Sequence, residues 1–354
     1  MDYSKSISIS LMILATIAVF YVLVVGKAFL VPLAIAIMTW YIINALSRVY
    51  AKYLPKIEQP NFITTTLSLI TIGVFSYFAF SMVEDNISAV SEAAPTYKQN
   101  FDVIIQSIVT RFNLETVPNI REMLTGIEIA PMITKLAGSF TNAIGNIFLV
   151  LIYVLFLMLE QGTFKNKIIS LFPNEQRRQS ILSILSHTQD DIQTYIWIKT
   201  LTSTATGIIS FIVLKLVGVD FAGFWAFTIF LLNFIPTIGS IIATLFPAML
   251  ALIQFGGFLE FFIVLIGVGA VQVVVGNLVE PKLMGNTLNL SPLVVMLSLT
   301  LWGSIWGVAG MFLSVPITVI LLIVFAHFDK TRYLAILLSG DGNLKFAENH
   351  SEKS

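Results

Sequence analysis

The sequence predicts an all-α, polytopic integral membrane protein with about eight transmembrane helices (range about seven to ten). Broken or re-entrant helices are expected in its C-terminal half. Of its 354 residues, 56% are hydrophobic and 11% are charged, whereas soluble domains have about 45–50% apolar and about 25% charged residues. Several charge-free runs also reach the roughly 20 residues that a bilayer-spanning helix needs. So little polar surface excludes a soluble enzyme, a disordered protein and a disulfide-stabilised extracellular domain.

The composition also excludes several kinds of chemistry. The chain has no Cys, and His187, His327 and His350 lie too far apart for a metal-binding motif. It has no GxxxxGK[ST] loop for ATP, and twenty acidic residues balance twenty basic ones, which leaves no basic surface for nucleic acid. We therefore expect no enzymatic activity, no cofactor, no metal and no nucleic-acid partner. Any transport would draw on a gradient across the bilayer.

The first part of the chain, residues 1–60, is predicted to be a transmembrane hairpin followed by a cytoplasmic loop. Two apolar runs, 9–26 and 28–47, follow each other with a turn near Gly26-Lys27. A signal peptide would be followed by a polar mature domain. We therefore expect both runs to be retained as transmembrane helices.

Residues 61–160 are predicted to form two spans, 62–83 and 136–159, on either side of a polar segment, 84–135. This segment is too polar to cross the bilayer. It contains helical apolar spacing, and we expect short amphipathic helices there. Prolines are expected to interrupt them at Pro95, Pro118 and Pro131.

The distribution of Lys and Arg predicts the orientation in the membrane. Basic residues cluster in the loop after the second run, after the fourth run and near both termini. If the first four runs alternate in direction, all these positions lie on one side, which the positive-inside rule makes cytoplasmic. We expect a multi-pass protein of the bacterial cytoplasmic (inner) membrane, with both termini cytoplasmic and residues 84–135 outside.

Residues 161–199 are predicted to form a cytoplasmic segment. From residue 175 to 199, Ile, Leu and Tyr recur at mostly helical spacing. This pattern indicates a cytoplasmic surface helix that leads into the fifth span. A gating or coupling role for the same helix is the alternative.

Residues 200–328 are predicted to form the transport core, and 329–354 a cytoplasmic tail. The fifth span opens with a run of hydroxyl residues from Thr200 to Thr206. Such residues either bond across helix contacts or line a wet cavity, and packing between helices is the simpler interpretation.

Two long charge-free stretches follow, 221–259 and 283–328. The first is interrupted at 233–240, where Pro236 removes a backbone donor, and the second at the glycine-rich segment 302–310. A proline follows each interruption, Pro247 and Pro316. Each stretch is long enough for two full spans or for one re-entrant hairpin. The spans that precede the two stretches run in opposite directions. This arrangement suggests an inverted repeat, which is typical of secondary transporters.

Between these stretches, the span 261–279 ends in the segment Asn277-Leu-Val-Glu280-Pro281-Lys282-Leu-Met-Gly285. Ionisable residues at membrane depth are costly and therefore indicate function. Glu280 is the leading candidate, and a Glu280–Lys282 pair at the membrane interface is the alternative. A solvated helix cap is a further alternative for Glu280. We expect this segment and 233–240 to be unwound and to line one solute path.

The C-terminal motifs resemble the autoinducer-2 exporter (AI-2E) family of bacterial membrane transporters. They are Asn233-Phe-Ile-Pro236-x-x-Gly239, the segment 277–285, and Trp302-Gly303 through Gly307, Gly310 and Ser314-Val-Pro316. The order of apolar and polar segments is similar over nearly the whole chain. The resemblance implies a secondary carrier that forms a homo-oligomer, with a pentamer expected. It also implies export of autoinducer-2, a small polar quorum-sensing signal, or sodium–proton antiport in some members.

The residues selected for the solute path and its hinges share a polar or backbone-shaping side chain in this core. They are Thr202, Thr206, Asn233, Pro236, Gly239, Asn277, Glu280, Pro281, Gly285, Gly307, Gly310 and Pro316.

Three functions compete. The first is an exporter permease for a small polar metabolite, autoinducer-2 or similar, with the lipid bilayer as its environment and a proton or sodium gradient as its driving force. The second is a cation–proton antiporter, which needs a titratable membrane carboxylate such as Glu280. The third is a membrane scaffold without transport activity, which leaves the broken helices unexplained.

Overall fold

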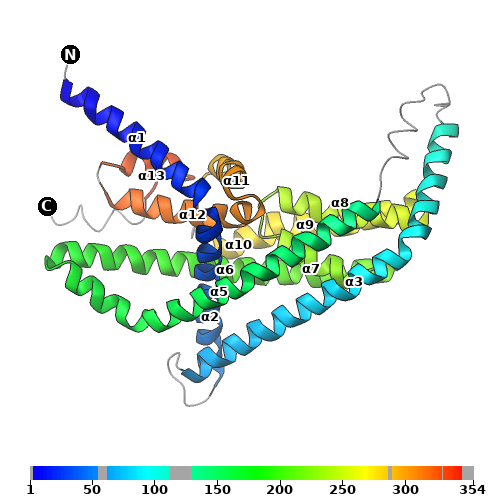
Figure 1. Cartoon of the computed structure of the whole chain (residues 1–354), viewed down its shortest axis with the longest axis horizontal. Coiled ribbons are helices and arrows are strands. Elements are labelled where there is room, and N and C mark those ends of the chain that lie inside the picture. Colours follow the sequence, from blue (N-terminus) through cyan, green and yellow to red (C-terminus); the bar gives the residue numbers. More distant parts are fainter. Residues whose placement is uncertain (1–2, 55–61, 112–128, 286–288, 329, 345–354) are drawn as a thin grey trace. The chain divides into compact units, whose positions relative to one another are not determined.

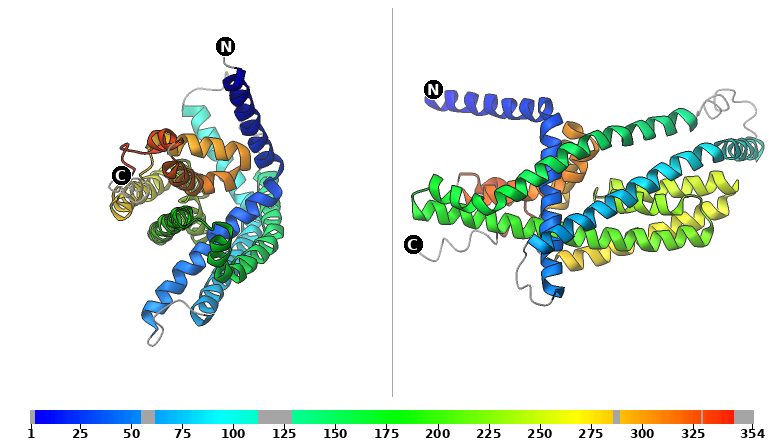
Figure 2. Two further views of the ribbon diagram at one scale, coloured as in Figure 1. Left: turned by 90° about the vertical axis from the view of Figure 1, so that its left-hand side faces the viewer. Right: turned by 60° about the horizontal axis from the view of Figure 1, so that its bottom comes forward.

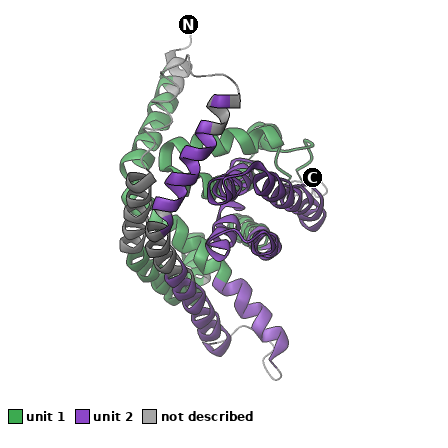
Figure 3. Cartoon of the chain, turned by 90° about the vertical axis from the view of Figure 1, so that its right-hand side faces the viewer, with its two compact units in different colours: residues 1–42, 146–193, 286–354 green, residues 43–145, 194–285 purple. Residues whose placement is uncertain are grey.

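The computed structural model describes residues 3–54, 62–111, 129–285, 289–328 and 330–344, and all its regular elements in these ranges are helices (Figure 1). The chain divides into two compact units (Figure 3). Unit 1 comprises 1–42, 146–193 and 286–354, and unit 2 comprises 43–145 and 194–285. The predicted all-α class is confirmed.

Six helical segments in the described ranges are long and apolar enough to cross a membrane: Lys27–Tyr53, Ile147–Phe164, Glu175–Val217, Ile238–Phe255, Phe258–Met284 and Val308–His327. Four shorter apolar stretches accompany them: Ser10–Val25, Phe62–Phe78, Ala222–Leu232 and Pro292–Trp306. Much of the apolar surface is exposed, including nearly all large side chains of residues 11–25, as contact with lipid requires. The chain is therefore a polytopic membrane protein. The total of about eight spans stays a prediction.

Unit 1 begins with α1 (Tyr3–Val25), which meets α2 (Lys27–Tyr53) at a bend at Gly26 (Figures 1 and 2). The predicted turn coincides with this bend. The unit also holds the end of α5 (Ile129–Leu171) and the start of α6 (Glu175–Val217). Its C-terminal part is α11 (Pro292–Trp306), α12 (Val308–His327) and α13 (Arg332–Leu338). The Trp306 indole donates a hydrogen bond to the carbonyl of Leu23 at 2.9 Å, which ties α11 to α1.

Unit 2 contains α3 (Phe62–Arg111), the rest of α6, and the succession that follows α6. This succession is α7 (Ala222–Leu232), α8 (Ile238–Phe255), α9 (Phe258–Val274), the π-helix η2 (Val275–Val279) and α10 (Glu280–Met284). Its core lies where α6, α7, α8 and α9 meet and is built from Leu214, Ile229, Ala243, Ala248, Ala251, Val264 and Val268.

The predicted break at Pro95 is wrong, because α3 continues as one helix of 50 residues with Pro95 inside it. Tertiary hydrogen bonds hold this end of α3 in place. The Tyr97 hydroxyl donates to the Asp220 carboxylate at 2.7 Å, and the Asn100 amide donates to the backbone carbonyl of Gln254 at 2.7 Å. Burial, together with the Asp220 carboxylate, raises the pKa of the Tyr97 hydroxyl. Pro118 lies outside the described residues, and Pro131 lies inside α5.

The segment predicted to lead into the fifth span is continuous with it. One helix, α6, runs for 43 residues from Glu175 to Val217. Its start is capped by the Asn174 side chain, which accepts a hydrogen bond from the Arg177 backbone at 3.1 Å. The helix ends at Gly218, which adopts a positive φ of 83°.

Both charge-free C-terminal stretches are pairs of helices joined by a short break. In unit 2, α7 ends at Leu232 and α8 starts at Ile238, which confirms the predicted break around Pro236. In unit 1, α11 ends at Trp306 and α12 starts at Val308. With 11 and 15 residues, α7 and α11 are about 16 and 22 Å long. Each is shorter than a bilayer core of about 30 Å, which favours re-entrant hairpins over two full spans.

The expectation that 277–285 is unwound is wrong. The helix continues from Phe258 to Met284, and it changes from α to π geometry over Val275–Val279. Gly285 then ends it with a positive φ of 51°.

Candidate functional site

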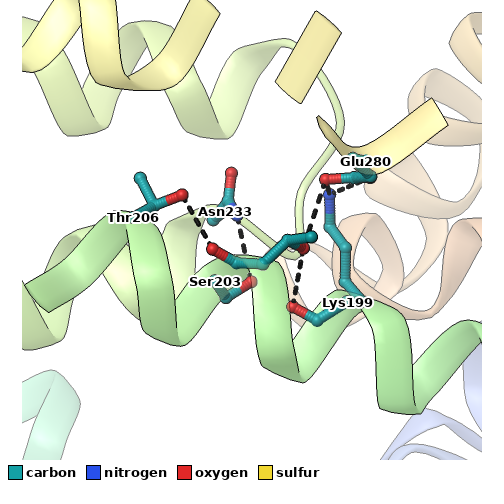
Figure 4. Close-up of polar contacts among 6 residues, drawn as sticks. Lys199, Ser203, Thr206, Asn233 and Glu280 are labelled. Atoms are coloured by element: carbon teal, nitrogen blue, oxygen red, sulfur yellow. Dashed lines mark hydrogen bonds and ion pairs between the residues drawn. The ribbon is translucent and has the colours of Figure 1, made fainter. Parts of the chain in front are cut away.

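A buried ion pair lies at the centre of the candidate site in unit 2. The Lys199 ammonium group contacts both carboxylate oxygens of Glu280, at 2.6 and 2.9 Å (Figure 4). Only 7% of the Lys199 side chain and 15% of the Glu280 side chain are exposed. Removing two charges from water is expensive, and their mutual attraction offsets this only when the geometry is good. Glu280 is thus paired with α6 and not with its neighbour Lys282, which is exposed.

Hydroxyl groups extend the polar face of α6 away from this pair. Thr202 is buried, and its Oγ1 lies 3.5 Å from Glu280 Oε2 while donating to the Lys199 carbonyl at 3.2 Å. Thr206, also buried, donates to the Thr202 carbonyl at 2.8 Å. Lys199 lies three and four residues before Thr202 and Ser203, and Thr206 lies four and three residues after them, which places all four on one face of the helix. Figure 4 shows this row.

The break between α7 and α8 contributes an amide to the same site. Asn233 ends α7, is buried, and donates from its side-chain nitrogen to Ser203 Oγ at 3.0 Å. Pro236 lies within the break, where its carbonyl accepts a hydrogen bond from Ile238. Gly239 opens the next helix, and a Cβ there would overlap the Leu232 carbonyl oxygen. Gly239 therefore permits the close approach that brings α8 back against α7.

The π-helix explains why Glu280 points towards α6. In an α-helix, five residues turn the chain by about 140° beyond one full turn, so Glu280 would face away from the side of the buried Val275. In the structure the Glu280 N–H donates to the Val275 carbonyl, five residues earlier. This π-type bond places Glu280, five positions later in the chain, above Val275. Pro281 has no N–H to donate to the preceding turn, which favours the wider turn at this position.

The other selected residues do not all join this site. Asn277 lies in the π-helix with an exposed side chain, and Pro281 is exposed as well. The α11–α12 pair of unit 1 contains Gly307, Gly310 and Pro316, so they do not belong to the site in unit 2. The structure therefore places Thr202, Thr206 and Asn233 along the polar face of α6 that holds the Lys199–Glu280 pair. Pro236, Gly239 and Gly285 shape the backbone nearby in the chain.

Sequence reasoning missed Lys199 and Ser203 as site residues. The sequence pattern places Lys199 at the end of the predicted cytoplasmic segment. The signal was present in its helical spacing relative to Thr202 and Thr206, but its partner Glu280 is 81 residues away in the chain and nothing in the local pattern connects the two.

A neighbouring face of α6 is apolar. Together with α3 and α7 it lines a crevice of about 270 Å³, whose walls include Phe75, Phe78, Gly207, Phe211, Phe227 and Phe230. Thr204 is the hydroxyl residue of α6 on this side, and its Oγ1 bonds to the carbonyl of Thr200 in its own helix. The buried hydroxyl residues Thr202, Ser203 and Thr206 lie instead on the face with Lys199, whereas Thr204 is exposed.

Comparisons with known proteins agree with the resemblance seen in the motifs. The model of the AI-2E transporter family matches residues 10–330. The AI-2 transport protein TqsA of Escherichia coli is 29% identical over 315 residues, which cover 88% of this chain and 89% of that protein. A Haemophilus influenzae protein, named only provisionally as a transport protein, is 33% identical over 319 residues, 88% of either chain.

Proposed function

This chain belongs to the AI-2E family of transporters, and from this premise we propose that it is a secondary transporter that exports a small polar metabolite, autoinducer-2 or a similar signal. The observation that carries the proposal is the similarity to a relative named as an AI-2 transport protein over 88% of this chain. The site supports it through its chemistry, because hydroxyl and amide groups surround a charge pair that is already neutralised. Such groups suit an uncharged solute that is rich in oxygen.

The proposed path follows the polar face of α6. Thr202, Thr206 and Asn233 line it, and the chain break at 233–237 supplies backbone groups outside a regular helix. Glu280 and Lys199 hold the end of α9–α10 against α6. In unit 1, we propose Gly307, Gly310 and Pro316 as hinge residues of the α11–α12 pair.

The site does not favour a sodium–proton antiporter. That mechanism needs a membrane carboxylate free to exchange a proton for a cation, and the ammonium group of Lys199 contacts both oxygens of Glu280.

We further propose a homo-oligomer, with a pentamer expected, in the bacterial inner membrane. A proton or sodium gradient would drive transport, and both termini would be cytoplasmic. Single cysteines at Ser91 and Ser351 test the orientation, since the chain has no Cys of its own. In intact cells an impermeant thiol reagent should label Ser91→Cys and spare Ser351→Cys. The opposite pattern contradicts the orientation.

Export is tested with purified protein in liposomes loaded with autoinducer-2. Efflux should depend on the protein and on an imposed gradient, and it should fall sharply in Glu280→Gln. A Lys282→Gln variant is the matched control, because it removes a charge from an exposed position on the same short helix. Protein-independent efflux would refute the proposed function. Normal efflux in a stable Glu280→Gln protein would remove Glu280 from the mechanism.

A further inference from the structure

Beyond the ion pair, and beyond Thr200 next to Lys199, three helices of unit 2 each carry a buried polar group without a hydrogen-bond partner among the described residues. They are the Ser210 hydroxyl on α6, the Trp225 indole N–H on α7 and the Gln272 side-chain NH₂ group on α9. Ser210 is fully buried and Gln272 is 7% exposed. Buried donors are normally paired, so each unpaired one calls for an explanation. None of the three belongs to the site described above.

The packing of α6 against α7 brings Ser210 and Trp225 to the same depth. The two helices run antiparallel, because Ser203 bonds to Asn233 and Gly207, further along α6, lies against Ala226 and Phe230, earlier in α7. Ser210 lies seven residues after Ser203, and Trp225 lies eight residues before Asn233. Seven and eight residues along antiparallel helices, counted from a common contact, differ in level by only about 1.5 Å.

The packing of α6 against α9 adds Gln272 at this depth. These helices meet at Lys199–Glu280 and again at Val213, whose side chain would lie 2.8 Å from a Cβ on Gly267. Ser210 lies three residues before Val213, and Gln272 lies five residues after Gly267. The remaining offset of two residues corresponds to roughly 3 Å along the helix. Three helices thus contribute unpaired donors to one level of the unit.

The chemistry of these groups selects the kind of ligand that they bind. An indole N–H and an amide NH₂ group only donate, and a hydroxyl both donates and accepts. A metal cation is bound by oxygen ligands and would be repelled by such donors. A buried anion would need a positive partner, and the Lys199 charge is already neutralised by Glu280. The groups match the oxygen atoms of an uncharged solute.

We propose that Ser210, Trp225 and Gln272 form a donor subsite that binds the oxygen atoms of a neutral, polyhydroxylated solute. The proposal rests on the proposed function and specifies the class of its substrate. The solute would continue the polar face of α6 beyond Thr206, one turn from Ser210. Binding the solute would pair donors that are otherwise left unpaired, so the subsite favours the loaded carrier.

The first test uses Gln272→Leu and Ser210→Ala in liposomes loaded with autoinducer-2. Each variant removes an unpaired group, so thermal stability in detergent should stay unchanged or rise. Efflux should nevertheless fall about tenfold, as expected when one hydrogen bond to the solute is lost. Thr204→Val is the matched control, because Thr204 is an exposed hydroxyl residue of the same helix. Loss of stability in proportion to loss of efflux would indicate a packing role and overturn the proposal.

The second test uses the Trp225 indole as a direct reporter of binding. Replacing Trp40, Trp197, Trp302 and Trp306 by Phe leaves Trp225 as the single tryptophan of the chain. Ribose, a neutral polyhydroxylated probe, should shift its fluorescence emission in a saturable manner, and Gln272→Leu should weaken this response about tenfold. Sodium chloride, added to the ionic strength of the assay buffer, should leave the Trp225 fluorescence emission unchanged. A response to sodium but not to ribose would overturn the proposal.

The two tests separate this inference from the exporter function. Normal autoinducer-2 efflux in both Gln272→Leu and Ser210→Ala would overturn the subsite and leave the exporter function intact. A ribose response that depends on Gln272, in a protein that does not transport autoinducer-2, would support the subsite and refute the named substrate.

Discussion

The α7–α8 pair of unit 2 and the α11–α12 pair of unit 1 use the same backbone arrangement. In both, a short apolar helix is followed by a break and by a longer helix that contains a proline, Pro247 or Pro316. In both, a glycine near the start of the longer helix backs directly onto a carbonyl group of the shorter one. Gly239 meets Leu232, and Gly310 meets Trp302.

The two pairs differ in where their polar groups are directed. The break in α7–α8 spans 233–237, and Asn233 bonds outward to Ser203 on α6. The break in α11–α12 is Gly307 alone, with a φ of 64°. There the Ser298 hydroxyl bonds within the pair, to the Ser314 carbonyl at 3.0 Å and to the Thr318 hydroxyl. One pair therefore contributes an amide to the proposed solute site, whereas the Ser298 hydroxyl of the other is satisfied within its own pair.

The largest expected effect tests what the pairs share. Gly239→Ala and Gly310→Ala should each destabilise the protein by about 3 kcal/mol, because the added methyl group overlaps a backbone oxygen that cannot rotate away. The measurement is the yield and thermal stability of detergent-solubilised protein. Gly73→Ala is the control, since a Cβ there would meet no atom within 4 Å outside its own stretch of helix backbone, and it should fold normally. Full stability in either variant would contradict the shared arrangement.

The Lys199–Glu280 ion pair, in the same unit as the α7–α8 pair, should have the next largest effect. Lys199→Met leaves a buried carboxylate unpaired and should cost about 3–5 kcal/mol. The double variant Lys199→Met/Glu280→Leu should recover most of this stability, because two apolar side chains replace a pair that had to be desolvated. Thermal unfolding of the four proteins of the cycle measures the coupling. A coupling near zero would show that the pair is not formed in the membrane.

Pro281→Ala tests the role of the π-turn. A proline at this place favours the wide turn that directs Glu280 to Lys199, so alanine should let the helix return to α geometry and rotate Glu280 away. The coupling between Lys199 and Glu280 should then fall by at least about 1 kcal/mol in a double-mutant cycle, and transport should fall with it. Pro247→Ala, at a proline in α8 away from the ion pair, should leave the coupling unchanged.

A smaller effect separates the two pairs directly. Ser298→Ala should reduce stability by about 1 kcal/mol, the usual net contribution of a hydrogen bond, with normal transport in the protein that remains folded. Asn233→Ala should reduce stability by a similar amount but should also impair transport, because Asn233 belongs to the solute site. Transport rates normalised to folded protein distinguish the two. Equal rates would contradict the functional difference between the α7–α8 pair and the α11–α12 pair.

The smallest effect concerns Asp341, which follows α13 and accepts a hydrogen bond from Asn289 in the loop before α11. The Asn343 backbone N–H and the Asn289 side chain donate to Asp341 and lower the pKa of its carboxyl group. A lowered pKa means that the contact favours the charged form, so its contribution is present above the ordinary Asp pKa of about 3.9. It is lost as the pH falls through the lowered pKa. The stability difference between the parent and Asp341→Asn should therefore shrink from pH 7 towards pH 3. A constant difference would contradict it.

Local features of the sequence were good predictors where one residue type determines the backbone. Pro236 marked a real break, and the continuous amphipathic pattern into the fifth span corresponds to α6. The same reasoning failed at Pro95 and at Pro281, where the helix continues. A proline removes one hydrogen bond, and whether the helix then ends, bends or widens depends on the contacts around it. At Pro95 these include the nearby bonds of Tyr97 and Asn100.

The sequence by itself determined that this chain is an all-α membrane protein, because apolar runs without charges can satisfy their backbone only as helices in lipid. It also determined the family, through motifs that are local in the chain. Only the tertiary structure decided that Lys199 pairs with Glu280 and that Asn233 meets Ser203. These contacts join helices far apart in sequence, and the Lys199–Glu280 pair also depends on a rotation about the helix axis that a single π-turn sets. Periodicity fixes which residues share a face, but packing fixes what that face meets.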